Sequence, residues 1–202
     1  MLKIGVLVSG RGSNLQSILD NVESGDLNVE IGLVISDREN AYALERAAEH
    51  GVDHKYINPR EYESKEKFEQ VMIDLFRDRG VELVLMAGFM RILTPYFIRE
   101  FKHRVMNIHP SLLPSFSGLH PQQQALDYGV KVSGCTVHFA DEGMDTGPII
   151  LQSAVPVLDD DDEDSLAARI LKEEHKIYPE AVKLFSEGRL KIEGRSVKIL
   201  DK

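Results

Sequence analysis

Residues 81–114 read VELVLMAGFMRILTPYFIREFKHRVMNIHPSLLP, and this stretch decides the fold. It opens with a nearly continuous apolar run, which is typical of a strand buried on both faces. Thr94 as N-cap and Pro95 as the first helical residue then predict a short helix. A second strand is predicted at 105–109, so the stretch reads strand, helix, strand, as in a parallel βαβ unit.

The second of these strands carries two polar side chains close to its end. Asn107 and His109 alternate with apolar neighbours, so a strand places both on one face. Pro110 lacks a backbone N–H and ends the strand there. Ligands of open parallel sheets bind at this carboxyl edge. An isolated Asn-x-His-Pro is more often an ordinary strand end with polar residues capping a loop, so the motif alone does not establish an active site.

The amino-terminal half repeats the same alternation. A strand over Leu2–Val8 leads through the glycine loop SGRGSN into a helix with apolar residues at helical spacing. We therefore expect an α/β, Rossmann-like fold with a mostly parallel, twisted sheet and helices on both faces. Further strands are predicted at 29–35 and 52–57, and further helices at 41–50 and 64–79.

The carboxyl-terminal half has a different pattern. Two strands flank the polar loop DEGMDT, which predicts an antiparallel strand pair or hairpin in this half. A long amphipathic helix follows, in which Pro179 should kink or restart the helix. We find no repeat, linker or domain boundary, so residues 1–202 are expected to form a single domain. The predicted elements are a short helix before Gly129, strands at 130–140 and 147–157, a helix from Ser165 to Tyr178, and a hairpin at 189–200 that turns at Glu193–Gly194.

Composition excludes several classes of protein. The chain has 202 residues, of which 43% are hydrophobic and 28% charged, and no apolar run is long enough to cross a membrane. The net charge of −9 argues against binding to nucleic acid or to an anionic membrane surface. We find no signal peptide, and the single cysteine, Cys135, is consistent with a reducing cytoplasm.

The first glycine loop is an expected anion site. Gly12, Ser13 and Asn14 lie where the first strand passes into the first helix, so backbone N–H groups and the helix dipole favour a negative ligand. Leu15 occupies the third position of a dinucleotide fingerprint, and the Gly-Lys-Ser/Thr of a P-loop is absent. Asp37 after the second strand keeps nicotinamide binding open as an alternative, but a small phosphate ester suits the loop better.

The candidate catalytic residues are Asn107, His109 and Asp145. An amide donor, an imidazole and a carboxylate suit acyl transfer to a nucleophile that the substrate itself carries. No zinc-binding spacing and no Gly-x-Ser-x-Gly elbow is present. We expect His138 to support the site rather than to act directly. The acidic run Asp159–Asp164 is interpreted as a solvated loop before a helix, and no metal is assigned.

Taken in order, several motifs resemble one family over nearly the whole chain. They are SGRGSNLQ, MAGFMRILTP, MNIHPSLLPSF, GLH, GCTVHFADEGMDTGPII and EEHKIYPEAV. Together they resemble the folate-dependent formyltransferases, in particular those that formylate phosphoribosylglycinamide in purine synthesis. The resemblance implies that 10-formyltetrahydrofolate is the cosubstrate and 5-phosphoribosylglycinamide the acceptor, with no metal.

The resemblance also implies a role for individual residues. Three residues of the glycine loop would hold the ribose phosphate, Glu174 would bind the ribose hydroxyls, and Lys65 would lie near the glutamate tail of the folate. Two loops and Asn107 would contact the folate itself. The loop residues are Met90, Arg91, Ile92 and Leu93 in the first loop and Asp141, Glu142, Gly143, Met144 and Asp145 in the second.

One loop departs from the family pattern. After Gly118-Leu119-His120 the family often continues with Thr-His, whereas this chain has Pro121-Gln122, and Ser117 replaces a common proline. Three alternatives remain open. Methionyl-tRNA formyltransferase and formyltetrahydrofolate hydrolase would need additional domains for which this chain has no room, and a noncatalytic metabolite sensor would not need the catalytic residue set. The sequence makes no prediction of oligomeric state.

Overall fold

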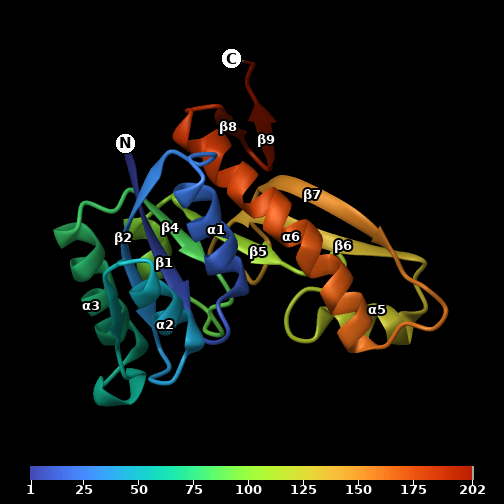
Figure 1. Cartoon of the computed structure of the whole chain (residues 1–202), viewed down its shortest axis with the longest axis horizontal. Helices are drawn as coiled ribbons and strands as arrows, with labels where there is room; N and C mark the ends of the chain where they lie inside the picture. Colours follow the sequence, from blue (N-terminus) through green and yellow to red (C-terminus); the bar gives the residue numbers. More distant parts are fainter. Residues whose placement is uncertain (202) are drawn as a thin grey trace. The chain divides into compact units, whose positions relative to one another are not determined.

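The computed structural model describes residues 1–201, and the chain divides into two compact units. The first unit is Met1–Asn107 and the second begins at Ile108, so the division falls inside one strand. Figure 1 labels the helices and strands of both units.

The first unit contains parallel strands in the order β3-β2-β1-β4-β5. This arrangement confirms the parallel βαβ units that the sequence predicts. The strands are β1 (Leu2–Val8), β2 (Val29–Ser36), β3 (His54–Tyr56), β4 (Leu83–Met86) and β5 (Val105–His109), the last of which ends in the second unit. The helices are α1 (Ser13–Glu23), α2 (Tyr42–Glu49), α3 (Lys65–Asp78) and α4 (Pro95–Glu100), with a 3-10 turn at Pro59–Glu61.

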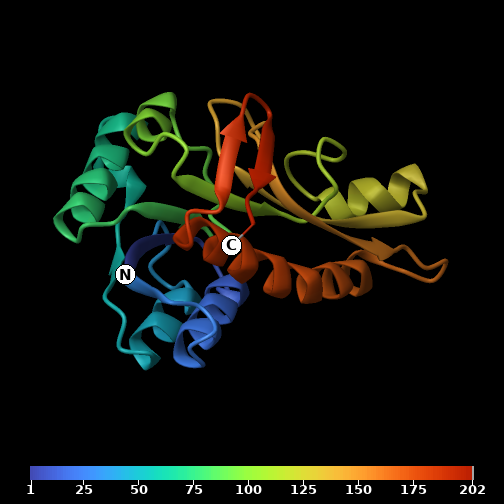
Figure 2. The same cartoon turned by 90° about the horizontal axis from the view of Figure 1, so that it is seen from above.

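Helices cover both faces of the strands in this unit. Figure 2 shows α1 and α2, in blue and cyan, on one side, and α3 and α4, in green, on the other. All four residues of β4 are buried, as the apolar run predicts. A Cβ atom on Gly5 of β1 would lie 2.4 Å from the ring of Phe76, so a glycine here permits α3 to pack closely against the sheet.

Thr94 occupies the N-cap position of α4, but it does not cap the helix with its side chain. Its hydroxyl instead donates to the carboxylate of Glu69 on α3, and its backbone N–H donates to the same group at 2.8 Å. Glu69 is buried, and this burial raises the pKa of its carboxyl above the ordinary value. The polar residue at the helix start therefore joins two helices rather than stabilising one.

The second unit contains the antiparallel pair β6 (Val132–Phe139) and β7 (Ile149–Pro156), as the sequence predicts. The hairpin of β8 (Leu190–Glu193) and β9 (Ser196–Ile199) is also confirmed, and β9 pairs with β7 through Ser196. The helices are α5 (Pro121–Tyr128) and the long α6 (Glu163–Ser186), which packs along β6 and β7 (Figure 1).

The expectation that α6 would restart at Pro179 is wrong, whereas a kink at this residue stays a prediction. The helix continues without interruption from Glu163 to Ser186, although proline removes one backbone donor. Its buried face includes Tyr178 and Val182, both with no exposed surface, so packing against the strands outweighs the local cost of the proline. At the start of the helix, Asp162 accepts the N–H of Ser165 in a capping box, which confirms the expected position of the acidic run.

Candidate functional site

His109 is the last residue of β5 and is only 6% exposed. Its Nε2 lies 2.9 Å from the backbone oxygen of Phe116. A carbonyl oxygen can only accept a hydrogen bond, so Nε2 must carry the hydrogen. The other ring nitrogen, Nδ1, faces Oδ2 of Asp145 at 3.5 Å. The backbone of the following loop therefore fixes which nitrogen His109 presents to the carboxylate.

Asp145 lies in the loop between β6 and β7 and faces two histidines. Its Oδ2 accepts the backbone N–H of Gly118 at 2.9 Å, and its Oδ1 lies 3.7 Å from Nε2 of His138. The residue has a φ of 54°, a left-handed backbone conformation that is uncommon for residues other than glycine. Such conformations cost free energy and concentrate at functional sites, so the backbone here supports a functional role for this carboxylate.

His138 is oriented in the same manner as His109. Its Nδ1 donates to the backbone oxygen of Phe139 at 3.0 Å, which leaves Nε2 directed at Asp145. The side chain is 2% exposed, and burial lowers the pKa of His138 below its ordinary value, although the hydrogen bond to Phe139 and the charge of Asp145 oppose this shift. We infer that His138 is neutral at neutral pH.

Two imidazoles and one carboxylate therefore form a cluster with a place for one additional proton. When both rings are neutral, each directs an unprotonated nitrogen at Asp145. A proton added to either ring would be stabilised by the carboxylate between them. This arrangement can take up a proton from one reacting group and return it to another, which is what acyl transfer between two nitrogens requires.

Two residues that the sequence analysis did not single out hold the loop after His109. Thr136 of β6 donates to the Ser111 oxygen at 2.7 Å and accepts the N–H of Leu113 at 3.0 Å. Gln152 of β7 donates to the Leu113 oxygen at 2.9 Å. These contacts fix the loop whose carbonyl orients His109. The only sequence signal was the presence of polar residues inside otherwise apolar strands.

The loop that carries Asp145 is also internally bonded. Asp141 accepts the N–H of Gly143 at 3.0 Å and the hydroxyl of Thr146 at 2.6 Å. A Cβ atom on Gly143 would lie 2.0 Å from that hydroxyl, so only glycine fits. Arg195, at the turn of the β8–β9 hairpin, donates to the Thr146 oxygen at 2.9 Å. The predicted folate loop is thus a defined turn.

In the first unit, the glycine loop forms the N-terminus of α1 as predicted. Gly12 is the N-cap with a φ of 72°, and a Cβ atom there would lie 2.6 Å from Cβ of Ala43 on α2. Arg46 of α2 donates to the Arg11 oxygen at 2.9 Å and so connects the loop to α2. Ser13 and Asn14 begin the helix, so their backbone N–H groups are oriented for an anion.

The segment after β4 presents apolar side chains to solvent. Met90 is 66% exposed and Ile92 is 58% exposed, whereas Leu93 is buried. Asn107 lies opposite Met86 of β4 in the register of β5 and is half-buried. Lys65 is the exposed first residue of α3.

Glu174 is buried on α6. Its neighbour Glu173 accepts the hydroxyl of Ser153 and pairs with Lys176.

The loop from Ser117 to Gln122, whose sequence departs from the family pattern, is held by a local hydrogen bond. Gln124 donates to the Leu119 oxygen at 2.8 Å, and His120 has a φ of 52° at the N-cap of α5, where Pro121 is the first helical residue.

Asp37 is not available to bind the hydroxyls of a nucleotide ribose. Its side chain is 2% exposed, and its carboxylate accepts the hydroxyl of Ser9 at 2.6 Å. The nicotinamide alternative rested on this residue, and the internal bond removes that support.

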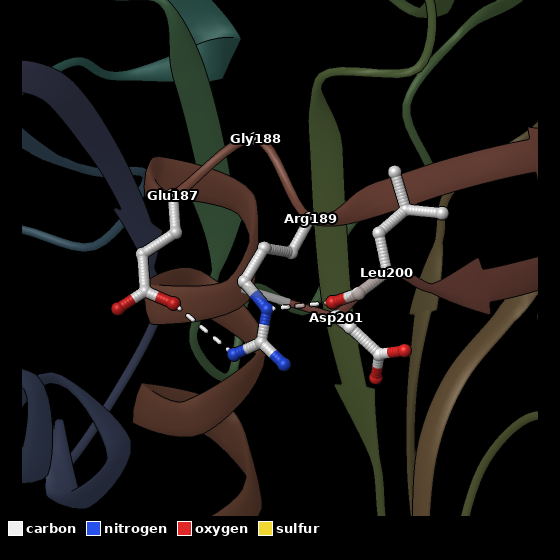
Figure 3. A pocket seen from close by; sticks show the side chains of 5 residues that line it. All are labelled: Glu187, Gly188, Arg189, Leu200 and Asp201. Carbon is white, nitrogen blue, oxygen red and sulfur yellow. Dashed lines mark hydrogen bonds and ion pairs between the residues drawn. The ribbon is translucent and has the colours of Figure 1, made fainter.

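Residues 1–201 contain a further pocket but no metal-binding cluster. No group of His, Cys, Asp and Glu side chains in this part of the chain is arranged to hold a metal ion, and none of its helices could span a membrane. A pocket in the second unit is lined by Glu187, Gly188, Arg189, Leu200 and Asp201 (Figure 3). The Arg189 guanidinium is engaged by Glu187 and by the Leu200 oxygen, so this pocket presents no unused cation to a ligand.

Comparison with known proteins agrees with this geometry. The model of the formyl transferase family matches residues 2–182. The trifunctional purine biosynthetic protein adenosine-3 of Drosophila melanogaster is 45% identical over 188 residues, which are 92% of this chain but 14% of that protein. The phosphoribosylglycinamide formyltransferase of Escherichia coli is 40% identical, over 95% of this chain and 90% of its own length.

A solved structure extends the likeness to three dimensions. The crystal structure of glycinamide ribonucleotide transformylase 1 from Symbiobacterium toebii has a TM-score of 0.98 and 54% identity, and the match covers 100% of this chain and 95% of that one. The chain therefore belongs to the formyl transferase family and, within it, to the group of phosphoribosylglycinamide formyltransferases.

Proposed function

We propose that this chain transfers the formyl group of 10-formyltetrahydrofolate to the amine of 5-phosphoribosylglycinamide. The products are formylglycinamide ribonucleotide and tetrahydrofolate, in de novo purine synthesis. The observation that carries the proposal is the cluster of His109, Asp145 and His138, in which backbone carbonyls direct one nitrogen of each ring at the carboxylate. The names of the relatives supply the substrate class.

Each step of the reaction has a group that can assist it. The neutral amine attacks the formyl carbon and forms a tetrahedral oxyanion, which the Asn107 amide would stabilise; one such donor is worth about 10²–10³ in rate. The amine then loses a proton, N10 of the folate gains one, and the C–N10 bond breaks. His109 would carry this proton on Nδ1, because Nε2 is bonded to the Phe116 oxygen, with a general-acid contribution of about 10²–10⁴. Asp145 stabilises the imidazolium while it holds the proton.

Binding of the phosphorylated acceptor is proposed for two places. Gly12, Ser13 and Asn14 would hold the phosphate through backbone N–H groups at the start of α1. Glu174 would accept hydrogen bonds from the ribose hydroxyls. A local site of this kind is needed because the chain carries a net charge of −9 and gives an anion no general attraction.

The folate is proposed to contact two loops. The first loop is Met90, Arg91, Ile92 and Leu93, in which the exposed apolar side chains of Met90 and Ile92 suit a flat aromatic ring system. The turn from Asp141 to Asp145, with Asn107, would supply polar contacts, and Lys65 would pair with the glutamate tail. We propose no metal for this chemistry.

We further propose that residues 1–202 act as one formyltransferase domain. The family model extends over both units, which supports this proposal. The proposed partners are these small molecules rather than nucleic acid or a membrane. The proposed compartment is the cytoplasm, which accords with a single, buried Cys135.

The decisive experiment follows deformylation of 10-formyltetrahydrofolate spectrophotometrically with and without 5-phosphoribosylglycinamide. A transferase consumes the donor only when the acceptor amine is present, and one formylated product forms for each tetrahydrofolate released. Consumption that does not depend on the amine would instead identify a hydrolase. No consumption in either condition would favour a noncatalytic binding protein.

A further inference from the structure

A buried carboxylate connects the ends of three neighbouring strands in the first unit. Asp37 directly follows β2, and its side chain is 2% exposed. The hydroxyl of Ser9, which directly follows β1, donates to Asp37 Oδ1 at 2.6 Å. A carboxylate can only accept, so the hydroxyl proton of Ser9 is committed to Asp37 and its lone pairs remain for another donor.

Ser9 also binds the turn that follows β4 through two atoms. Its backbone N–H donates to the Gly88 oxygen at 3.1 Å. Its Oγ accepts the backbone N–H of Met90 at 2.8 Å. The two bonds lie on either side of Phe89, so one serine fixes the backbone of this turn at two points. Its bond to Asp37 keeps the hydroxyl in the orientation that the Met90 contact needs.

Arg91 provides a second connection between the same carboxylate and the turn. Its Nη1 lies 3.8 Å from Asp37 Oδ2, and its guanidinium lies 5.6 Å from the ring centroid of Phe68 on α3. The backbone and one side chain of the turn are therefore anchored, while Met90 and Ile92 remain 66% and 58% exposed. Large apolar side chains held outward on a fixed backbone form a surface that is organised before its ligand arrives.

We propose that Ser9 and Asp37 are positioning residues for the folate cosubstrate, because they hold residues 88–93 in the conformation that binds it. This inference rests on the proposed function. Neither residue touches the ligand in this proposal; both act through the turn. Preorganisation raises affinity because the loop does not have to be ordered during binding. Loss of the brace should therefore weaken folate binding and leave the chemistry of the bound complex nearly unchanged.

The test compares Ser9→Ala and Asp37→Asn with the parent protein. Ser9→Thr retains the hydroxyl and should restore binding. Ser186→Ala is the matched control, because Ser186 is a partly buried serine of α6 whose hydroxyl donates to the Lys183 oxygen and takes no part in the contacts of Ser9 and Asp37. Three quantities are measured: the Kd for tetrahydrofolate by calorimetry, kcat with the KM of each substrate, and hydrogen–deuterium exchange of residues 88–93.

We expect Ser9→Ala to raise the Kd and the folate KM about tenfold, the equivalent of one hydrogen bond to a charged network. Asp37→Asn keeps an acceptor for Ser9 and should raise both about threefold, because it loses the attraction to Arg91 at 3.8 Å and to the exposed Arg38 at 3.9 Å. Exchange of residues 88–93 should become faster in both variants. The Ser186→Ala control should match the parent in all three measurements.

The possible outcomes separate this inference from the proposed function. Parent protein that binds tetrahydrofolate, with variants that bind it equally well, would overturn the inference alone. Equal rises in the KM of both substrates, or a fall in kcat without a change in Kd, would also overturn it. Parent protein that binds no tetrahydrofolate would overturn the proposed function, and the exchange data would then still report whether Ser9 and Asp37 hold the turn.

Discussion

Replacement of Asp145 by asparagine removes the negative charge and keeps the size and shape of the side chain. The carboxamide oxygen can keep the bond to the Gly118 N–H, which is 2.9 Å long in the parent. The amide nitrogen then faces Nε2 of His138, which is an acceptor in the tautomer that the Phe139 carbonyl imposes. The bond to Gly118 is therefore retained, and the charge that stabilises a protonated His109 or His138 is lost.

The size of this loss follows from the distance. Asp145 Oδ2 lies 3.5 Å from Nδ1 of His109, which at an effective dielectric constant of about 20 corresponds to about 4–5 kcal/mol in favour of the imidazolium. The Asp145 side chain is 12% exposed, so solvent screens part of this attraction. We expect an effect of about 3 kcal/mol, which is a decrease in kcat of about 10²-fold.

Formyl transfer under saturating concentrations of both substrates measures the effect directly. Glu163→Gln is the matched control, because Glu163 faces the imidazole of His120 at 3.4 Å but the two side chains are 43% and 76% exposed. An exposed pair of this kind contributes little, so kcat should stay within about twofold of the parent. If kcat of the folded Asp145→Asn protein falls less than about threefold, the assigned role of the Asp145 charge is wrong.

Three further predictions concern stability. Gly12→Ala should lower the free energy of unfolding by about 2–4 kcal/mol in thermal denaturation, because φ is 72° and the new Cβ would lie 2.6 Å from that of Ala43. His138→Gln should flatten the pH dependence of urea unfolding below pH 6.5: burial lowers the folded pKa of His138, so the unfolded chain binds the proton more readily and the parent loses stability on acidification. Glu69→Gln should have the opposite signature, because burial raises the folded pKa of Glu69 and the parent loses stability as the pH rises above 4.5; urea unfolding at pH 5 and pH 8 should show a gain for the variant only at the higher pH.

Local patterns in the sequence predicted the strands and most of the helices correctly. Val105 to His109 alternate and meet Pro110, and the strand ends there because both signals lie within six residues. The glycine loop before Ser13 was also predicted from a local signal. Its residue Gly12 has the left-handed φ, which glycine permits, at the start of α1. Pro179 shows the limit of such signals, because a strong local rule was overridden by the packing of one face of α6.

The orientation of the histidines could not be predicted from the sequence. The rings of His109 and His138 are oriented by hydrogen bonds to backbone carbonyls. Every residue has a carbonyl, so the residue types in the sequence do not reveal these contacts. The left-handed conformations of Phe116 and Asp145 likewise depend on contacts with distant segments. The role of Thr136 could not be predicted either, because threonine is common in strands. Its hydrogen bonds to Ser111 and Leu113 are evident only in the folded structure.

Asp37 shows why position in a fold does not by itself fix the role of a residue. An acidic residue after the second strand of a Rossmann-like sheet suggests contact with a ribose. In this chain the Asp37 carboxylate accepts the hydroxyl of Ser9, and the same hydroxyl accepts the backbone N–H of Met90. Asp37 therefore supports residues 88–93. Leu15, at the third glycine position of a dinucleotide fingerprint, is fully buried and serves the core. Two positions that would serve a dinucleotide are therefore used to build the protein itself, which accords with our proposal that a smaller phosphate and a ligand with an apolar ring bind at this edge of the sheet.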